Sequence, residues 1–217
     1  FNEAIESYTL LGRAHGLSGD LKGAIEDYQR ALTIARTHNI TAAEGRILYE
    51  IGRLHRFLGE SNAAEENLRN AFIIANNQND DILLAETANQ LGGYLLEYGF
   101  DKEALSVFEK GHEAAISGHP KMIGYFLNRR AEIMMHSGEL DEAEKLFLQA
   151  VRQYEENGDI RAQAFTSHRL GNLAFRRGQY DEAIRLHEEA LNKHQTIGER
   201  VGVCWAMINI SDIKLRV

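Results

Sequence analysis

The histidines are the residues of this sequence most suited to binding a metal. Their spacing does not match that of a metal site. Nine histidines are present, and two pairs, His112/His119 and His187/His194, are seven residues apart. Neither pair has a third ligand at a spacing typical of zinc sites. The segment Leu-His-Glu-Glu at 186–189 lacks the second histidine of the HExxH metalloprotease motif. We therefore expect no metal site.

Nucleophilic and phosphate-binding chemistry is not supported either. The single cysteine, Cys204, adjoins Trp205 in an apolar segment, with no paired histidine and aspartate to activate a thiol. The glycines match neither GxxxxGK[ST] nor GxGxxG, so no phosphate loop is predicted. Acidic pairs are numerous, but their positions are typical of solvated helix faces rather than of a glycosidase. We expect no catalytic residue and no cofactor, and we predict that the chain is not an enzyme.

Composition indicates a globular protein and excludes some partners. The chain has 217 residues, of which 44% are hydrophobic, and a net charge of −8. An acidic chain has little general affinity for nucleic acid or for an anionic membrane surface, so neither is expected as a partner. No apolar run approaches the roughly 20 residues that span a bilayer. With only one cysteine, a reducing cytoplasm is the expected location.

Small residues recur along the chain at a spacing of 39 or 40 residues. The first small residue of each copy lies mid-helix in the expected structure, and the second, always glycine, follows seven residues later. Alanine or glycine then recurs five and twelve residues after that second glycine. The first column contains Gly12, Gly52, Gly92, Ala131, Gly171 and Ser211, and the second contains Gly19, Gly59, Gly99, Gly138 and Gly178. Four columns in step over five copies identify an internal repeat.

Each repeat is predicted to form two helices. Apolar residues at helical spacing fill the first half, and the second glycine ends that helix in a left-handed conformation. A glycine inside a helix costs about 1 kcal/mol relative to alanine, so the mid-helix glycines indicate close approach of the paired helix. Alanines of the second helix, such as Ala24 and Ala31, would pack against the mid-helix glycine of the first helix. Pro120 is expected at the first position of a helix.

The pattern resembles the tetratricopeptide repeat. In the first repeat the positions that carry the resemblance are Tyr8, Leu11–Gly12, His15, Ala24, Tyr28 and Ala31; in the second they are Leu48, Ile51–Gly52, His55, Ala64, Leu68 and Ala71. The resemblance covers the whole chain and implies an all-α fold, a right-handed α-solenoid of five helix-turn-helix repeats plus one extra C-terminal helix. It also implies a single domain over 1–217, with repeats near 1–40, 41–80, 81–119, 120–159 and 160–200 and a partial copy at 201–217.

Two departures from the family pattern narrow the resemblance. The period exceeds the usual 34 residues, and the proline that commonly ends the second helix is absent. Both departures imply longer helices, and the chain looks like the long-period variant found in the helical sensor regions of bacterial LuxR-type and STAND regulators.

The resemblance also implies where partners bind. First helices of the family line a concave face, and a peptide or protein segment would lie in that groove. The residues that flank the small column there are Arg13, Arg46, Arg53, Arg56, Asn89, Asn128, Arg129, His168, Arg169, Asn172, Arg176 and Asn209. Asparagine can bond an extended backbone, and arginine can hold carboxylates. The alternative is a solvated face whose arginines and glutamates pair with one another.

The last segment, 201–217, is apolar nearly all round. We expect either that a further helix or domain follows it or that this end self-associates. The leading interpretation is a protein-interaction module, the sensor or scaffold part of a larger regulatory protein. The alternative is the regulatory half of a signalling enzyme or transcription regulator that senses a small molecule or oligosaccharide.

Overall fold

The computed structural model describes residues 1–216. It divides into two compact units, residues 1–120 and 121–217. The first unit contains α1 (Asn2–Ser18), α2 (Leu21–Thr37), α3 (Thr41–Leu58), α4 (Ser61–Gln78), α5 (Asp81–Glu97) and α6 (Asp101–Gly118). The second contains α7 (Ile123–Ser137), α8 (Leu140–Glu156), α9 (Ile160–Arg176), α10 (Tyr180–Thr196) and α11 (Arg200–Arg216). The described residues form no strand, which confirms the all-α prediction.

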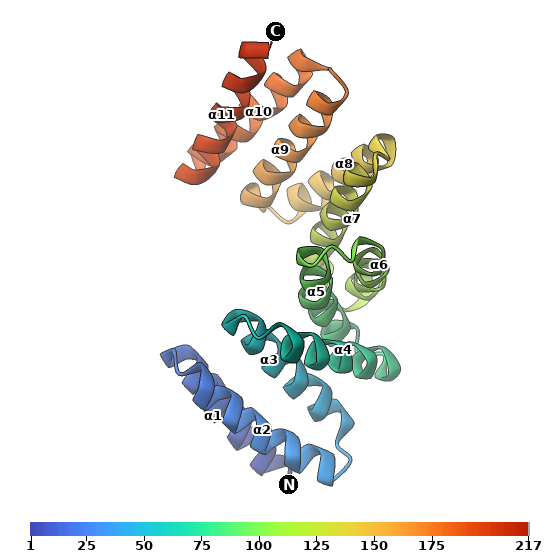
Figure 1. Cartoon of the computed structure of the whole chain (residues 1–217), viewed down its shortest axis with the longest axis vertical. Coiled ribbons are helices and arrows are strands. Elements are labelled where there is room, and N and C mark those ends of the chain that lie inside the picture. The colour runs from blue at the N-terminus through green and yellow to red at the C-terminus, as the bar shows by residue number, and fades with distance from the viewer. Residues whose placement is uncertain (217) are drawn as a thin grey trace. The chain divides into compact units, whose positions relative to one another are not determined.

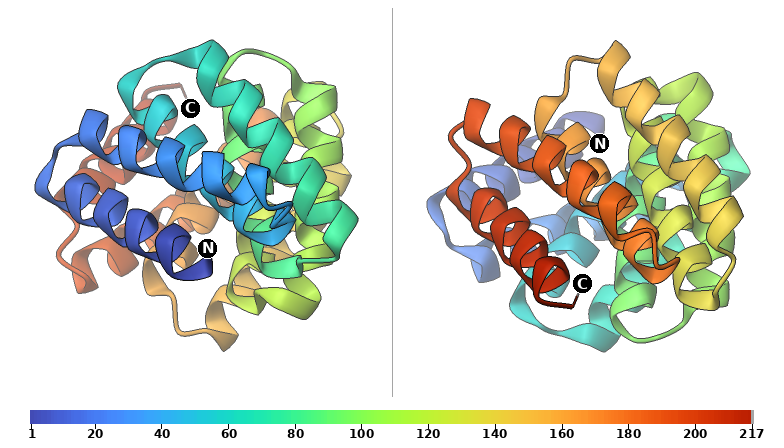
Figure 2. Two further views of the ribbon diagram at one scale, coloured as in Figure 1. Left: turned by 90° about the horizontal axis from the view of Figure 1, so that it is seen from below. Right: turned by 90° about the horizontal axis from the view of Figure 1, so that it is seen from above.

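Within each unit the helices pair as predicted. Consecutive helices form the hairpins α1–α2, α3–α4, α5–α6, α7–α8 and α9–α10, and α11 packs against α10 (Figure 1). Figure 2 shows α1 beside α2 in its left panel and α10 beside α11 in its right panel. Five helix-turn-helix repeats and an extra C-terminal helix are therefore confirmed.

The mid-helix glycines lie where the paired helix comes closest. A Cβ atom added to Gly92 would lie 2.3 Å from the ring of Phe108, and one added to Gly52 would lie 2.8 Å from Leu68. Carbon atoms cannot approach so closely, so only glycine fits without a shift in these neighbours. The space that glycine leaves is therefore filled by the bulky residue of the second helix, such as Leu68 between Ala64 and Ala71, and not by the alanines alone. Tyr28 and His187 occupy the same position beside Gly12 and Gly171.

Helix ends also follow the prediction. Gly19, Gly59 and Gly138 end α1, α3 and α7 in the left-handed conformation, with φ between 76° and 88°. This conformation is accessible to glycine at little cost, so the second glycine stops each first helix. Pro120 differs from its prediction, because it opens a 3₁₀ turn, Pro120–Met122, and the α-helix begins only at Ile123.

The outer face of α11 is exposed. Val201, Trp205, Met207, Ile208 and Leu215 are each more than half exposed, whereas Gly202, Ala206 and Ile213 are buried against the preceding helices. The predicted apolar character of this helix is therefore present on the surface. That a further helix or domain, or a second copy of the chain, covers this surface remains a prediction.

Candidate functional site

The first helices of unit 1 line the largest cavity described in that unit, with a volume of about 780 Å³. Its lining residues come from α1, α3 and α5, with Leu21 and Tyr28 of α2 at its base; they are Gly12, Arg13, Gly16, Leu17, Leu21, Tyr28, Glu50, Arg53, Leu54, Arg56, Phe57, Gln90 and Glu97. Three of the predicted binding residues, Arg13, Arg53 and Arg56, are therefore brought together. We call this cavity the unit 1 groove.

The three arginines of the unit 1 groove differ in their partners. Arg53 pairs with Glu50 on its own helix at 2.9 Å. Arg56 reaches from α3 to α5, where it pairs with Glu97 and donates to the Gln90 carbonyl oxygen at 3.2 Å. Arg13 is exposed and forms no ion pair with any of residues 1–216. It is thus the groove cation whose charge is available to a ligand.

Gly93 lies beside the Arg56 guanidinium, one residue after the small column. A Cβ atom at this position would lie 3.2 Å from the guanidinium, which could shift aside by a few tenths of an ångström.

The same groove also has apolar surface. Leu17 is 90% exposed and Phe57 is 81% exposed, and both lie near the C-terminal ends of their first helices. At the base, burial and the nearby Glu50 carboxylate raise the pKa of Tyr28 to about 12, against the opposing effects of Arg53 and Arg13. The phenol therefore stays neutral at physiological pH. Apolar side chains and an available guanidinium together suit a ligand that is both apolar and anionic.

Two other predicted residues of unit 1 lie outside this groove. Arg46 of α3 pairs with Glu86 of α5, and its guanidinium lies 5.9 Å from the Tyr49 ring centroid. Asn89 is half-buried and forms no side-chain hydrogen bond within residues 1–216. Arg46 thus braces two first helices, while Asn89 keeps its hydrogen-bonding capacity.

In unit 2, Asn128 and Arg169 connect neighbouring first helices, and Arg129 pairs within its own helix. Asn128 donates from Nδ2 to the Thr166 hydroxyl at 2.8 Å, which connects α7 to α9. Arg129 and Arg169 both pair with Glu132, at 2.8 and 2.9 Å. The two ion pairs with Glu132 correspond to the alternative in which the arginines and glutamates of this face pair with one another.

Arg176, and Asn209 together with His168, also connect neighbouring first helices of unit 2. Arg176 donates to the Met135 carbonyl oxygen at 2.8 Å, and Asn209 donates to Nε2 of His168 at 3.2 Å. His168 is only 9% exposed, so it is a core residue more than a surface one. Asn172 is half-buried and lines a small cavity of unit 2.

The predicted face therefore combines structural braces with a few available polar groups. Within the described chain, Arg13, Asn89 and Asn172 make no side-chain hydrogen bond or ion pair. The groove also contains residues that were not predicted from the sequence, among them Leu17, Tyr28, Phe57 and Gln90. Leu17 and Phe57 could have been found, because each follows its small residue by five positions in successive repeats.

The described part of the chain, residues 1–216, contains no group of three or more potential metal ligands. None of its helices has both the length and the apolar content that a membrane crossing needs.

The architecture defines a helical-repeat protein, and comparison with protein families identifies the repeat. Models of the tetratricopeptide repeat match residues 5–38, 45–77, 124–196 and 162–217, well over half of the chain. The chain therefore belongs to the tetratricopeptide repeat family. Repeats of this family are generally non-catalytic modules for protein–protein interaction, and the matches indicate no catalytic family.

Several solved structures have the same fold. A STAND protein with a tetratricopeptide repeat sensor from Pyrococcus horikoshii matches with a TM-score of 0.81 and 18% identity, over 97% of this chain and 32% of that chain. Aspartyl phosphate phosphatase F from Bacillus subtilis matches at 0.76 and 14%, over 94% and 54%. BtubC from P. vanneervenii matches at 0.72 and 19%, over 98% and 82%.

These identities establish the fold alone. This chain spans about a third of the STAND protein and about half of the phosphatase. A search of curated proteins finds no match.

Proposed function

We propose that this chain is a protein-interaction module that binds a peptide or protein segment along its first helices. The observation that supports it most is the unit 1 groove, where Arg13 has no ion pair among residues 1–216 and Leu17 and Phe57 are largely exposed. An unpaired guanidinium beside apolar side chains binds a carboxylate together with a hydrophobic anchor. The proposed ligand is therefore an acidic segment that contains an apolar residue.

The twelve predicted residues have two roles in this proposal. The residues available for ligand contact are Arg13 and Asn89 in unit 1 and Asn172 in unit 2, because their side-chain polar groups form no hydrogen bond or ion pair among residues 1–216. Residues such as Arg46, Arg56 and Arg169 hold successive first helices in register, so that the contacting groups keep their spacing. Preorganised groups bind more tightly because less freedom is lost on binding.

Charge reversal at Arg13 tests the groove. We expect peptides selected by the 217-residue chain from a random library to carry Asp or Glu next to an aliphatic or aromatic residue. Arg13→Glu should weaken their binding at least tenfold, since a hydrogen bond to a charged group contributes about 1.5–3 kcal/mol. Isothermal titration calorimetry with the selected peptides measures this change.

Lys102→Glu is the matched control, because Lys102 is exposed on a second helix, α6, and has no ion pair within residues 1–216. It changes the net charge by the same amount as Arg13→Glu. Equal weakening by both variants would indicate a general charge effect and contradict the groove. Unchanged binding by Arg13→Glu would also contradict it.

We further propose that the module is the sensor or scaffold part of a larger regulatory protein. The support is the likeness to a STAND protein whose repeats form its sensor, of which this chain spans about a third. The complete coding sequence tests this proposal. An adjoining ATPase, DNA-binding or catalytic domain is expected, and a gene that encodes these repeats alone would contradict it.

A further inference from the structure

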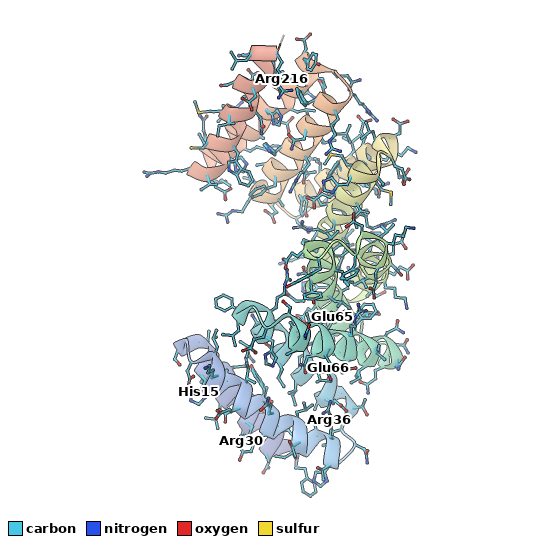
Figure 3. The ribbon with its side chains drawn as sticks, viewed as in Figure 1. His15, Arg30, Arg36, Glu65, Glu66 and Arg216 are labelled. Atoms are coloured by element: carbon cyan, nitrogen blue, oxygen red, sulfur yellow. The ribbon has the colours of Figure 1, made fainter. Side chains whose placement is uncertain are left out.

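A second, smaller cavity lies in unit 2 between α9, α10 and α11. Its volume is about 80 Å³, and its polar lining residues are Asn172, His187, Asn209, Asp212 and Arg216. Figure 3 labels Arg216 on α11. Asn172 and Asp212 each follow the small column by one residue, as Arg13 and Arg53 do in the unit 1 groove. The cavity therefore occupies the same position of the repeat, with different chemistry.

The orientation of Asn209 in this cavity is fixed by a buried neighbour. Its Nδ2 donates to Nε2 of His168 at 3.2 Å, so Nε2 carries no proton. Burial, with smaller contributions from His187, Arg169 and His194, lowers the pKa of His168 to about 4. His168 is therefore neutral at physiological pH, and the Asn209 Oδ1 atom remains as a hydrogen-bond acceptor.

His187 contributes a neutral polar group to the same cavity. It is 1% exposed, and its Nδ1 atom has no hydrogen-bond partner among residues 1–216. Burial lowers the pKa of this ring to about 4, so it does not add a positive charge. A buried polar atom without a partner costs about 1–3 kcal/mol, so this ring is a costly part of the cavity wall.

The two charged residues of the cavity have opposite signs. Asp212 and Arg216 are four residues apart on α11, and neither forms an ion pair within the described chain. The Arg216 guanidinium lies 5.5 Å from the Phe175 ring centroid. An anionic ligand would be attracted by Arg216 but repelled by Asp212, and a cationic ligand the reverse. Neither charge is therefore favoured in this cavity.

We propose that this cavity binds a side-chain carboxamide, that of a glutamine or asparagine in the segment that the protein recognises. A carboxamide is uncharged and has both a donor and an acceptor, which match the Asp212 carboxylate and the Asn172 amide. A volume of about 80 Å³ exceeds the roughly 30 Å³ of one water molecule and holds a group of a few heavy atoms. The inference rests on the proposed function and specifies part of its ligand.

Nuclear magnetic resonance with small probes tests the cavity in the 217-residue chain. N-acetyl-glutamine N-methylamide should shift the imidazole signals of His187 and the side-chain amide signals of Asn172 and Asn209. The corresponding glutamate and lysine derivatives should bind at least about fivefold more weakly, the effect of one hydrogen bond. Asn172→Leu should abolish the glutamine response, whereas Asn192→Leu, at an exposed position of α10, should leave it unchanged.

Equal responses to the three probes, or a glutamine response that survives Asn172→Leu, would overturn the assignment. So would a chain in which His187 and Asn172 do not respond at all. A native-like amide spectrum of each variant shows that it is folded. The two proposals fail separately: peptide binding that depends on Arg13 but gains nothing from glutamine leaves the unit 1 groove intact and removes only the carboxamide cavity.

Discussion

Replacing Gly92 by alanine is expected to lower the free energy of unfolding by about 2 kcal/mol, the usual cost of overfilling a packed core. The new Cβ atom would lie 2.3 Å from the Phe108 ring, and Phe108 is fully buried, so the ring cannot move aside without disturbing its neighbours. Alanine favours the helix by about 1 kcal/mol over glycine, which offsets only part of the clash. Urea denaturation monitored by circular dichroism measures the difference.

Gly16→Ala is the matched control on another first helix. The nearest atom to its added Cβ is the Ala24 Cβ atom at 4.0 Å, an ordinary contact. The helix preference of alanine then acts alone, and stability should stay unchanged or rise by up to about 1 kcal/mol. If Gly92→Ala proves as stable as Gly16→Ala, the steric explanation of the repeat is wrong.

Acidification from pH 7 to pH 5 is expected to destabilise unit 2. Burial lowers the pKa values of His168 and His187 to about 4, whereas both rings titrate near 6.5 when unfolded. Their contribution to stability is therefore complete above pH 6.5 and is lost as the pH falls toward 4, because the unfolded chain takes up the protons first. Each histidine should cost about 2 kcal/mol by pH 5.

His187→Leu separates this effect from general acid denaturation. Leucine occupies the equivalent position in the second repeat, at Leu68, so the side chain suits the site. The variant should lose roughly half of the pH dependence between pH 7 and 5 and should be at least as stable at pH 5. Urea denaturation at each pH measures the free energy of unfolding. If this free energy changes with pH as much in the variant as in the original chain, the assignment to His187 is wrong.

The fold could be predicted because its determinants are local and sterically strict. Gly52 and Gly92 lie against bulky side chains, and Gly19 and Gly59 adopt left-handed conformations, so each position tolerates little besides glycine. A strict requirement repeated every 39 or 40 residues is visible in one sequence. Pro120 stands first in a helical segment, as expected, but that segment is a 3₁₀ turn, because the fixed φ of proline suits a 3₁₀ turn as well as the first turn of an α-helix.

The candidate site was less predictable, since its chemistry depends on contacts between repeats. Arg46 and Arg56 have the same residue type as Arg13, but each reaches an acidic partner some 40 residues further along the chain. A long, flexible arginine side chain can take such a partner or face solvent, and the sequence does not distinguish the two outcomes. Only the structure shows that the charge of Arg13 is available.

The histidines illustrate the same limit. Sequence spacing did not indicate that His187 takes the place of an apolar residue in the core. Aligning the repeats places His187 with Tyr28, Leu68 and Phe108, and that column is the signal that could have revealed it. Polarity in an otherwise apolar column is a feature worth following in other repeat proteins.

Binding on the first helices is the central claim, and chemical-shift mapping tests it most directly. A peptide selected by the protein is titrated into the isotope-labelled chain, and the perturbed residues are placed on the structure. We expect the largest changes on α1 and α3, around Arg13, Leu17 and Phe57. Changes confined to the outer surfaces of the second helices α2, α4 and α6 would contradict it.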